Sequence, residues 1–393
     1  MTKRQLGQFF TVNSDYVLNG LKGYIKGKSV CDPFAGSGEL LAWAKRHGAR
    51  KISGFDVDPQ MKNRKYHIAF GDSLLVPKSY RFVITNPPYL NINKASFETK
   101  QRYFSIHRDL QDLYQISLQA IMRSEEGIII VPINFLSAEN AERIRLEFLD
   151  KFEIPAMNYF EEQVFPDTTY NVIAFYYRRK RKPGSAMSIN TKIFPSKAKT
   201  KITIKQATGW RIGADQLEKI NSTPNFLGAY RLQEKHMERG PMEIPAAYNH
   251  IKNRTTVQVS ENLGDLIRKN ILLLKSIDSG SKSGEVALED IRKYGVSCLV
   301  SKPTSRHMIQ IIFEKDIPIQ EQERLIHLFN ETIGDLRKNT FSLFLTNYRD
   351  KGRKRVSFEF AYRLLNHLYY REFGQNYFAN GSLFRAEKCL GQS

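Results

Sequence analysis

The four residues Asn86-Pro87-Pro88-Tyr89 form the stretch of the sequence that is best suited to catalysis. Proline fixes the backbone φ angle and disfavours helix at the residue before it, so two successive prolines make a stiff loop. The Asn86 carboxamide oxygen and the Pro87 carbonyl oxygen are acceptors that can hold one amino group and turn its nitrogen lone pair out of conjugation with a ring. Tyr89 adds a flat face for stacking a base, worth about 1–3 kcal/mol. The alternative interpretation is a rigid turn with a packed tyrosine.

A glycine-rich loop, residues 32–38, precedes this stretch and reads Asp-Pro-Phe-Ala-Gly-Ser-Gly. Glycines let the backbone approach a ligand closely, and the free N–H groups of a following helix would point toward that ligand. The spacing matches neither of the phosphate-binding glycine motifs. Asp32 would repel a phosphate and suits the ammonium group of an amino-acid-like ligand. An ordinary glycine-rich turn is the alternative.

Two further carboxylates follow predicted strands. Asp56 lies 20 residues after Gly36, where a carboxylate can accept hydrogen bonds from ribose hydroxyls. Asp72 can accept one from an adenine amino group, although either residue alone could be a turn or helix cap. Together with the glycine-rich loop they describe a nucleoside site without phosphates. S-adenosylmethionine, which combines an amino acid, a ribose and an adenine, fits that site and is the predicted cofactor.

The elements that must position these residues alternate between apolar runs and amphipathic patterns. This alternation predicts an α/β fold, a Rossmann-like and mainly parallel sheet with helices on both faces. Ligands bind beyond the carboxyl ends of strands in such sheets, which is where each motif falls. The predicted strands are 29–31, 52–55, 81–85, 127–131 and 171–177, and the predicted helices are 39–47, 109–123 and 137–152, the last with Ser137 as its cap.

The length of 393 residues predicts more than one domain. Five consecutive cations at 178–182, followed by Pro-Gly, indicate a boundary or an exposed crossing. We therefore expect a catalytic domain at 1–184 and a mixed α+β region at 185–393 that reads nucleic acid.

The chain has 60 basic and 40 acidic residues, a formal charge of +20. Such an excess attracts polyanions, with nucleic acid the first candidate and an anionic membrane surface the second. A merely basic protein is the alternative. The three cysteines are far apart and show no CxxC spacing, so neither a disulfide framework nor a metal site is expected. Without a signal peptide or an apolar run of about 18 residues, a cytoplasmic protein with no membrane span is predicted.

These motifs, in this order, resemble the amino-group DNA methyltransferases of bacterial restriction–modification systems. Gly7-Gln8-Phe9-Phe10-Thr11 is similar to the motif that precedes their cofactor domain, and the glycine-rich loop, the Asn-Pro-Pro-Tyr loop and a C-terminal target-recognition region follow. This is the gamma arrangement of the TaqI-like N6-adenine enzymes. The resemblance covers residues 5 to about 180.

The resemblance implies a role for each matching residue. Thr11 would contact the methionine carboxylate, Asp56 the ribose and Asp72 the adenine of the cofactor, while Asp32, Phe34, Gly36 and Gly38 would line the methionine half. Asn86, Pro87, Pro88 and Tyr89 would hold a flipped-out adenine in duplex DNA, with Phe165 closing its other side. Here the sequence departs from the family, because residues 167–170 replace a more basic stretch.

Phosphate contacts are expected from the basic stretches, although such runs are commonly solvated faces. The expected partners are double-stranded DNA and a cognate restriction endonuclease acting on the same site, without a stable complex, and the chain is expected to be a monomer. The candidate nucleic-acid-binding residues are Arg178, Arg179, Lys180, Arg181, Lys197, Lys199, Arg353, Lys354 and Arg355.

Other functions share the catalytic loop and stay open. They are methylation of an RNA base amino group, methylation of a protein glutamine, and non-catalytic DNA binding by a relic of a methyltransferase. Cytosine C5 methylation is excluded, because it needs a nucleophilic cysteine, characteristically after proline, and no cysteine here follows one.

Overall fold

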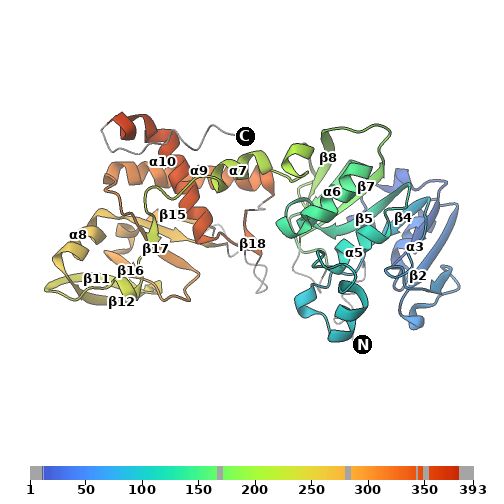
Figure 1. The fold of residues 1–393 in the computed structure, drawn as a ribbon, viewed down its shortest axis with the longest axis horizontal. Helices are drawn as coiled ribbons and strands as arrows, with labels where there is room; N and C mark the ends of the chain where they lie inside the picture. The colour runs from blue at the N-terminus through green and yellow to red at the C-terminus, as the bar shows by residue number, and fades with distance from the viewer. Residues whose placement is uncertain are drawn as a thin grey trace. The chain divides into compact units, whose positions relative to one another are not determined.

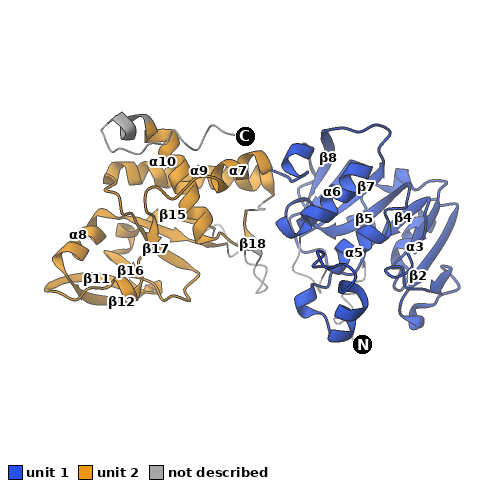
Figure 2. Ribbon diagram, viewed as in Figure 1, with its two compact units in different colours: residues 1–213 blue, residues 214–393 orange. Residues whose placement is uncertain are grey.

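The computed structural model describes residue 11 and residues 13–165, 171–278, 285–341, 344–347 and 354–379. The chain divides into two compact units, residues 1–213 and 214–393 (Figures 1 and 2). The first unit contains the predicted loops.

Unit 1 is built on a nine-stranded sheet in the order β3-β2-β1-β4-β5-β7-β6-β8-β9. The strands from β3 to β5 pair in parallel, β7 is antiparallel to both neighbours, and β6 pairs in parallel with β8. The predicted α/β architecture with a mainly parallel sheet is confirmed. The strands are β1 (Ser29–Asp32), β2 (Lys51–Asp56), β3 (Ile68–Phe70), β4 (Phe82–Thr85), β5 (Glu126–Pro132), β6 (Phe152–Phe160), β7 (Val172–Arg179), β8 (Ala186–Phe194) and β9 (Ala198–Lys205).

The centre of the sheet is fully buried, as a strand covered on both faces requires. Residues 128–131 of β5 are all 0% exposed. Gly127 lets this strand pack closely, because a Cβ there would lie 2.5 Å from the Val83 carbonyl oxygen and 2.7 Å from the Tyr177 ring. The helices of unit 1 are α2 (Ser14–Val17), α3 (Glu39–Arg46), α4 (Phe97–Thr99), α5 (Leu113–Ala120) and α6 (Glu142–Lys151).

Two predicted helices begin later than expected. Asp112 and Gln115 form a capping box, so α5 starts at Leu113 rather than Asp109. Ser137 caps no helix, since its hydroxyl donates back to the Ile133 carbonyl oxygen at 3.2 Å. Short 3₁₀ turns occupy the segment before α6.

The boundary predicted at 184/185 differs from the division at 213/214. The cations at 178–182 end β7 and enter a turn, after which β8 and β9 extend the same sheet. Alternate residues of this hairpin are buried, among them Ile189 at 0% and Ile204 at 1% exposed. The lysines between them made the segment look like a separate basic region.

Unit 2 combines helices with small sheets, so its predicted α+β composition is confirmed. Its sheets have the orders β10-β17-β13-β15, β12-β11-β16 and β14-β19-β18, and its largest core cluster includes residues of α7, α9 and α10. The helices are α7 (Ala214–Asn221), α8 (Glu261–Lys269), α9 (Ile319–Thr340) and α10 (Phe358–Ala379). The strands are β10 (Tyr230–Arg231), β11 (Met242–Tyr248), β12 (His250–Val259), β13 (Leu272–Lys275), β14 (Ile277–Asp278), β15 (Ala287–Asp290), β16 (Cys298–Val300), β17 (Met308–Ile312), β18 (Thr346–Asn347) and β19 (Lys354–Arg355).

Candidate active site

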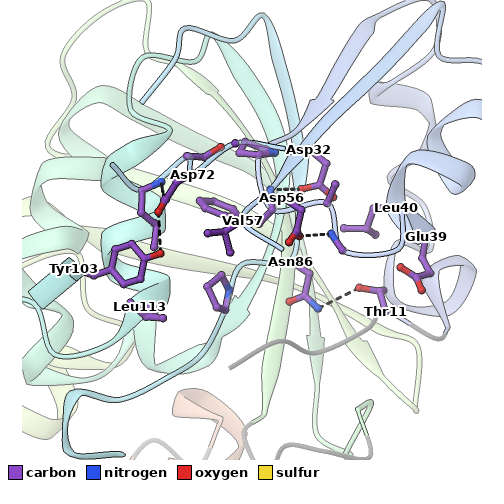
Figure 3. A pocket seen from close by; sticks show the side chains of 18 of the residues that line it. Thr11, Asp32, Glu39, Leu40, Asp56, Val57, Asp72, Asn86, Tyr103 and Leu113 are labelled. Carbon is purple, nitrogen blue, oxygen red and sulfur yellow. Dashed lines mark hydrogen bonds between the residues drawn. The ribbon is translucent and has the colours of Figure 1, made fainter. Parts of the chain in front are cut away.

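A pocket opens at the carboxyl ends of β1, β2 and β4, where parallel-sheet ligands bind (Figure 3). Its empty volume is about 840 Å³, part of it open to solvent. Most of the predicted catalytic and cofactor-binding residues meet here. The lining consists of Thr11, Asp32, Pro33, Phe34, Ala35, Gly36, Glu39, Leu40, Asp56, Val57, Gly71, Asp72, Ser73, Leu74, Asn86, Pro88, Thr99, Tyr103 and Leu113.

Asp32 ends β1 and is 1% exposed. Its Oδ1 accepts hydrogen bonds from the Thr85 hydroxyl at 2.7 Å and the Phe34 N–H at 3.0 Å. Burial raises the pKa of this carboxyl to about 7, although the two hydrogen bonds oppose the rise. A carboxyl so poorly solvated gains most from a cation placed beside it.

Asp56 fixes the glycine-rich loop. Its Oδ2 accepts from the Gly36 N–H at 2.8 Å, and its Oδ1 accepts from the Asp58 N–H at 2.8 Å. Gly36 has a φ of +50°, in the region that favours glycine. Burial raises the pKa of Asp56 as well. Two carboxyl groups therefore line the pocket, Asp32 from the glycine-rich loop and Asp56 from the end of β2.

Gly38 does not line the pocket, in contrast to the expectation from the resemblance. Its φ is +91°, and a Cβ there would lie 2.8 Å from Cδ2 of Tyr66 and 3.0 Å from Cδ1 of Ile68. The second glycine is needed for packing and for the left-handed turn at the start of α3.

Asp72 is held by partners that the sequence analysis did not identify. Its Oδ2 accepts from Arg102 Nη2 at 2.7 Å, Arg102 Nε at 3.1 Å and the Tyr103 hydroxyl at 2.9 Å. Its Oδ1 accepts from the backbone N–H of Leu74 at 3.1 Å. Arg102 and Tyr103 come from a π-helical turn, Lys100–Phe104, whose position depends on tertiary packing and leaves no clear signal in the sequence.

Asn86 follows β4 and is 9% exposed. Its Nδ2 donates to the Thr11 hydroxyl at 3.1 Å, and its Oδ1 lies within hydrogen-bonding distance of the Tyr89 hydroxyl. Tyr89 also approaches the Ile130 carbonyl oxygen at 2.8 Å. Since a hydroxyl has one proton, Tyr89 donates to one of these acceptors at a time. The carboxamide is thus oriented at both ends.

The two aromatic residues expected to sandwich a base are buried. Tyr89 is 5% exposed and packs edge-on against Tyr114, with ring centroids 6.5 Å apart. Phe165 is 1% exposed. Neither lines the pocket, and Pro87 does not line it either, whereas Pro88 does. In this conformation both side chains are almost fully buried, so their rings offer no open stacking face.

Three of the predicted phosphate-binding cations are engaged within unit 1. Arg178 pairs with Glu153, and Arg179 donates to the Ser124 and Met122 carbonyl oxygens at 2.8 Å each. Lys180 lies 4.4 Å from the centroid of the Trp210 ring. Arg181, Lys197 and Lys199 are exposed, Lys354 and Arg355 form β19, and Arg353 lies outside the described residues.

The parts of the chain that the structure describes offer neither a metal site nor a membrane span. There, no group of three or more His, Cys, Asp or Glu side chains could hold a metal ion. Likewise, none of the described helices has the length and hydrophobicity needed to cross a membrane. Cys31 and Cys298 are free thiols, and Cys389 is outside the described ranges.

Solved structures with detectable similarity include a modification subunit of a putative type I restriction enzyme from Vibrio vulnificus. It has 18% identity and a TM-score of 0.37, covering 54% of this chain and 52% of that one. A putative RNA methyltransferase from Pyrococcus horikoshii has 18% identity and a TM-score of 0.32, covering 46% and 90%. A putative class I S-adenosylmethionine-dependent methyltransferase from Listeria monocytogenes has 16% identity and a TM-score of 0.34, covering 45% and 61%.

Similarity at this level supports no functional assignment. The chain spans about half the length of the proteins of type I restriction–modification systems that it matches, with 52%, 44% and 52% covered in three of them. No curated protein sequence matches.

A family model matches part of unit 1. The match spans residues 45–165, which include Asp56, Asp72 and the Asn86–Tyr89 loop but begin after the glycine-rich loop. The family is described as the Eco57I restriction-modification methylase, and residues 45–165 of this chain are similar to it.

Proposed function

We propose that this chain is a DNA methyltransferase of a restriction–modification system that uses S-adenosylmethionine to methylate N6 of a flipped-out adenine in duplex DNA. The observation that carries the proposal is the placement of Asn86 and Pro88 on the wall of the same pocket as Asp32 and Asp56. The match to a restriction-modification methylase family supports the enzyme class. The gamma arrangement, similar to the TaqI-like enzymes, remains part of the proposal.

The pocket residues fit the cofactor by their chemistry. The buried Asp32 carboxylate is suited to the ammonium of the methionine part, because a cation relieves its poor solvation. Asp56 can accept from the ribose hydroxyls while keeping its two backbone N–H partners, since each carboxylate oxygen has two lone pairs. S-adenosylmethionine supplies an electrophilic methyl group on its sulfonium sulfur.

At the adenine end, the donors from Arg102 and Tyr103 hold the Asp72 carboxylate in one orientation. Tyr103 also lines the pocket, so its ring can form part of the wall against the cofactor adenine. We assign Arg102 as a positioning residue that acts through Asp72.

The target amino group is assigned to Asn86. The Thr11 hydroxyl accepts from the Asn86 amide nitrogen, so the Asn86 carboxamide oxygen is available as an acceptor for the target amino group. An incoming N6 amino group takes the position of the Tyr89 hydroxyl on Asn86 Oδ1, while that hydroxyl keeps the Ile130 carbonyl oxygen as its partner. Stacking of the base on Tyr89 requires the loop to rearrange, because the ring is buried in this structure.

Catalysis in this scheme comes from position and electrostatics. The pocket would hold the target amino group beside the cofactor's methyl group, and the Asn86 carboxamide oxygen would stabilise the positive charge that develops on N6. Base flipping is required because N6 is engaged in pairing within the duplex. The proton leaves to solvent during or after transfer.

An Asn86→Ala variant tests the catalytic assignment. It should lose methyl transfer by at least about 100-fold, the usual effect of removing one preorganised transition-state contact, and should bind the cofactor within about 2-fold of wild type. Methyl transfer from labelled cofactor and cofactor binding by calorimetry measure the two effects. Normal transfer by the variant would overturn the assignment of the loop.

The substrate is tested by offering duplex DNA, structured RNA and a release-factor-like protein in the same labelled-methyl assay. Transfer to DNA, with N6-methyladenine in the digested product, is the expected result. Transfer to RNA or to a protein glutamine would replace the proposal with one of the enzymes that share this loop. Cofactor binding without transfer to any substrate would indicate a non-catalytic relic.

Further features of the proposal concern the rest of the chain and its setting. Unit 2 carries target recognition, the enzyme acts as a cytoplasmic monomer, and a cognate restriction endonuclease acts on the same DNA site. Single-molecule sequencing of DNA from expressing cells would identify the recognition sequence together with the modified base.

A further inference from the structure

The β8–β9 hairpin of unit 1 presents a surface on which lysines are the only charged residues. Lys192 lies directly opposite Lys199 in the antiparallel register, and Asn190 lies opposite Lys201. These residues border a groove with an empty volume of about 910 Å³ that is open to solvent. We call it the lysine groove, and its lining is Asn19, Gly20, Leu21, Ala156, Met157, Asn158, Asn190, Thr191, Lys192, Lys199, Thr200 and Lys201.

The positive charge of the lysine groove is not balanced by acidic side chains in the described part of unit 1. Among the residues that the structure describes, no aspartate or glutamate lines it. Lys192 Nζ donates to the neutral Asn19 side chain at 2.8 Å, and neither Lys199 nor Lys201 forms an ion pair with a described residue. Like charges directly opposite each other across a ladder destabilise the pair, so this arrangement is unfavourable unless an anion relieves it.

The floor of the lysine groove is a fixed structure. Asn158 is 3% exposed, and its Nδ2 donates to the carbonyl oxygens of Val17 at 3.0 Å and Asn19 at 2.9 Å. Tyr16 packs edge-on against Phe194, with ring centroids 5.1 Å apart. The segment that contributes Asn19 is thereby fastened to β6 and β8, and the groove is preorganised for a ligand.

The lysine groove lies toward the same edge of the sheet as the candidate active site. Because β6 is parallel to β5, and β8 is parallel to β6, their carboxyl ends lie at the edge where β1, β2 and β4 form the pocket. Lys192 is near the carboxyl end of β8, and Lys199 is near the start of β9.

From these observations we propose that the lysine groove binds the phosphate backbone of the duplex DNA that carries the target base. The inference rests on the proposed function, which supplies the identity of the polyanion. Lys199 and Lys201 are two residues apart on one face of a strand, a separation of about 7 Å. Each DNA strand presents a phosphate for about every 3.4 Å of helix axis, so the two side chains can reach phosphates of one strand.

Lysines on an edge strand have another use, because they discourage pairing of the edge with a second sheet. A glutamate serves that purpose equally well and repels phosphate. Charge reversal therefore separates DNA binding from protection of the edge.

The test compares two double variants of the full chain with equal changes of net charge. The first variant, Lys199→Glu with Lys201→Glu, alters the lysine groove. The control, Lys26→Glu with Lys51→Glu, alters exposed lysines at the amino ends of β1 and β2, on the side of the sheet opposite the candidate active site. The readouts are the dissociation constant for duplex DNA across a series of salt concentrations, the KM for DNA, and the affinity for S-adenosylmethionine. A Lys199→Gln and Lys201→Gln pair repeats the test if the glutamate pair does not fold.

In the lysine-groove variant we expect weaker DNA binding, a higher KM for DNA and unchanged cofactor affinity. Loss of two phosphate contacts should reduce the slope of log affinity against log salt by about 2. If wild-type protein methylates DNA and both double variants bind it equally well, the lysine-groove proposal is wrong and the proposed function stands. If wild-type protein neither binds nor methylates duplex DNA, the proposed function fails, and the DNA assigned to this groove fails with it.

Discussion

Asp32 is the residue at which burial and charge compete most directly. It is 1% exposed, and its pKa of about 7 means that the carboxyl is largely protonated in mildly acidic solution. Any ligand whose cation binds the carboxylate form must displace that proton. The position thus couples ligand binding to pH through a single group.

We predict that the affinity for S-adenosylmethionine rises with pH up to about 7. Below the folded-state pKa, each unit of pH should change the dissociation constant by up to about 10-fold, because binding expels one proton from Asp32. Above pH 7 the affinity should level off. Calorimetry between pH 5 and 7.5 measures the effect. This pH range lies below about 7.7–8.0, where an α-amino group such as that of the cofactor titrates.

Asp32→Asn is the matched control, because an amide oxygen can still accept from Thr85 and Phe34. Its cofactor affinity should be weak and independent of pH. In the protein without cofactor, Asp32 has a higher pKa in the folded state than in the unfolded state. The stability that its protonated form contributes is therefore present below the pKa of the unfolded state and is lost as pH rises toward 7. The Tm of Asp32→Asn should therefore increase relative to the Tm of wild type as pH rises toward 7. A difference in Tm between the two proteins that does not change with pH would contradict this prediction.

At the scale of elements, the parts of the fold that could be predicted are those with a local signal. The apolar run of β5 marks a buried strand, and the polar residues Asp32, Asp56 and Asn86 mark the ends of β1, β2 and β4, without tertiary information. The π-helical turn carrying Arg102 had no such signal, because its position depends on packing against distant residues. Similarly, the outward lysines of β9 masked an amphipathic strand whose inner face is buried.

Arg145 of α6 connects several elements through one buried side chain. It is 1% exposed and donates to the carbonyl oxygens of Phe135 at 3.2 Å, Ala138 at 2.9 Å and Gly209 at 2.6 Å. These acceptors belong to the turns before α6 and to the final segment of unit 1. Burial lowers the pKa of the guanidinium to about 10, so it remains charged at neutral pH.

We predict that Arg145→Ala destabilises unit 1 by about 3 kcal/mol, because it leaves three carbonyl oxygens without this donor. Arg143→Ala in the same helix is the matched control, since the Arg143 side chain is 47% exposed and pairs with the acidic side chains of Asp109 and Glu147. That substitution should cost less than about 1 kcal/mol. Chemical denaturation measures the free energy of unfolding of both variants. Equal losses of stability would show that the buried hydrogen bonds of Arg145 contribute no more than the exposed ion pairs of Arg143.

For the whole molecule, the position of the boundary decides which fragment is stable. Every described residue that lines the candidate active site lies between Thr11 and Leu113, within unit 1. The sheet of that unit continues through β8 and β9, which bury Ile189, Phe194 and Ile204. A chain that ends at residue 184 would leave the partners of these side chains on β6 exposed to water.

We therefore predict opposite behaviour for two fragments that share the complete pocket. Residues 1–213 should fold cooperatively and bind S-adenosylmethionine within about 2-fold of the full chain, because the fragment keeps the whole sheet. Residues 1–184 should aggregate, since they expose a large apolar face and an unpaired strand edge. Scanning calorimetry and light scattering distinguish the two outcomes, and equal folding by the shorter fragment would place the end of the folded unit before β8.

The longer fragment should also lose site-specific methylation while keeping cofactor affinity, because target recognition is assigned to unit 2.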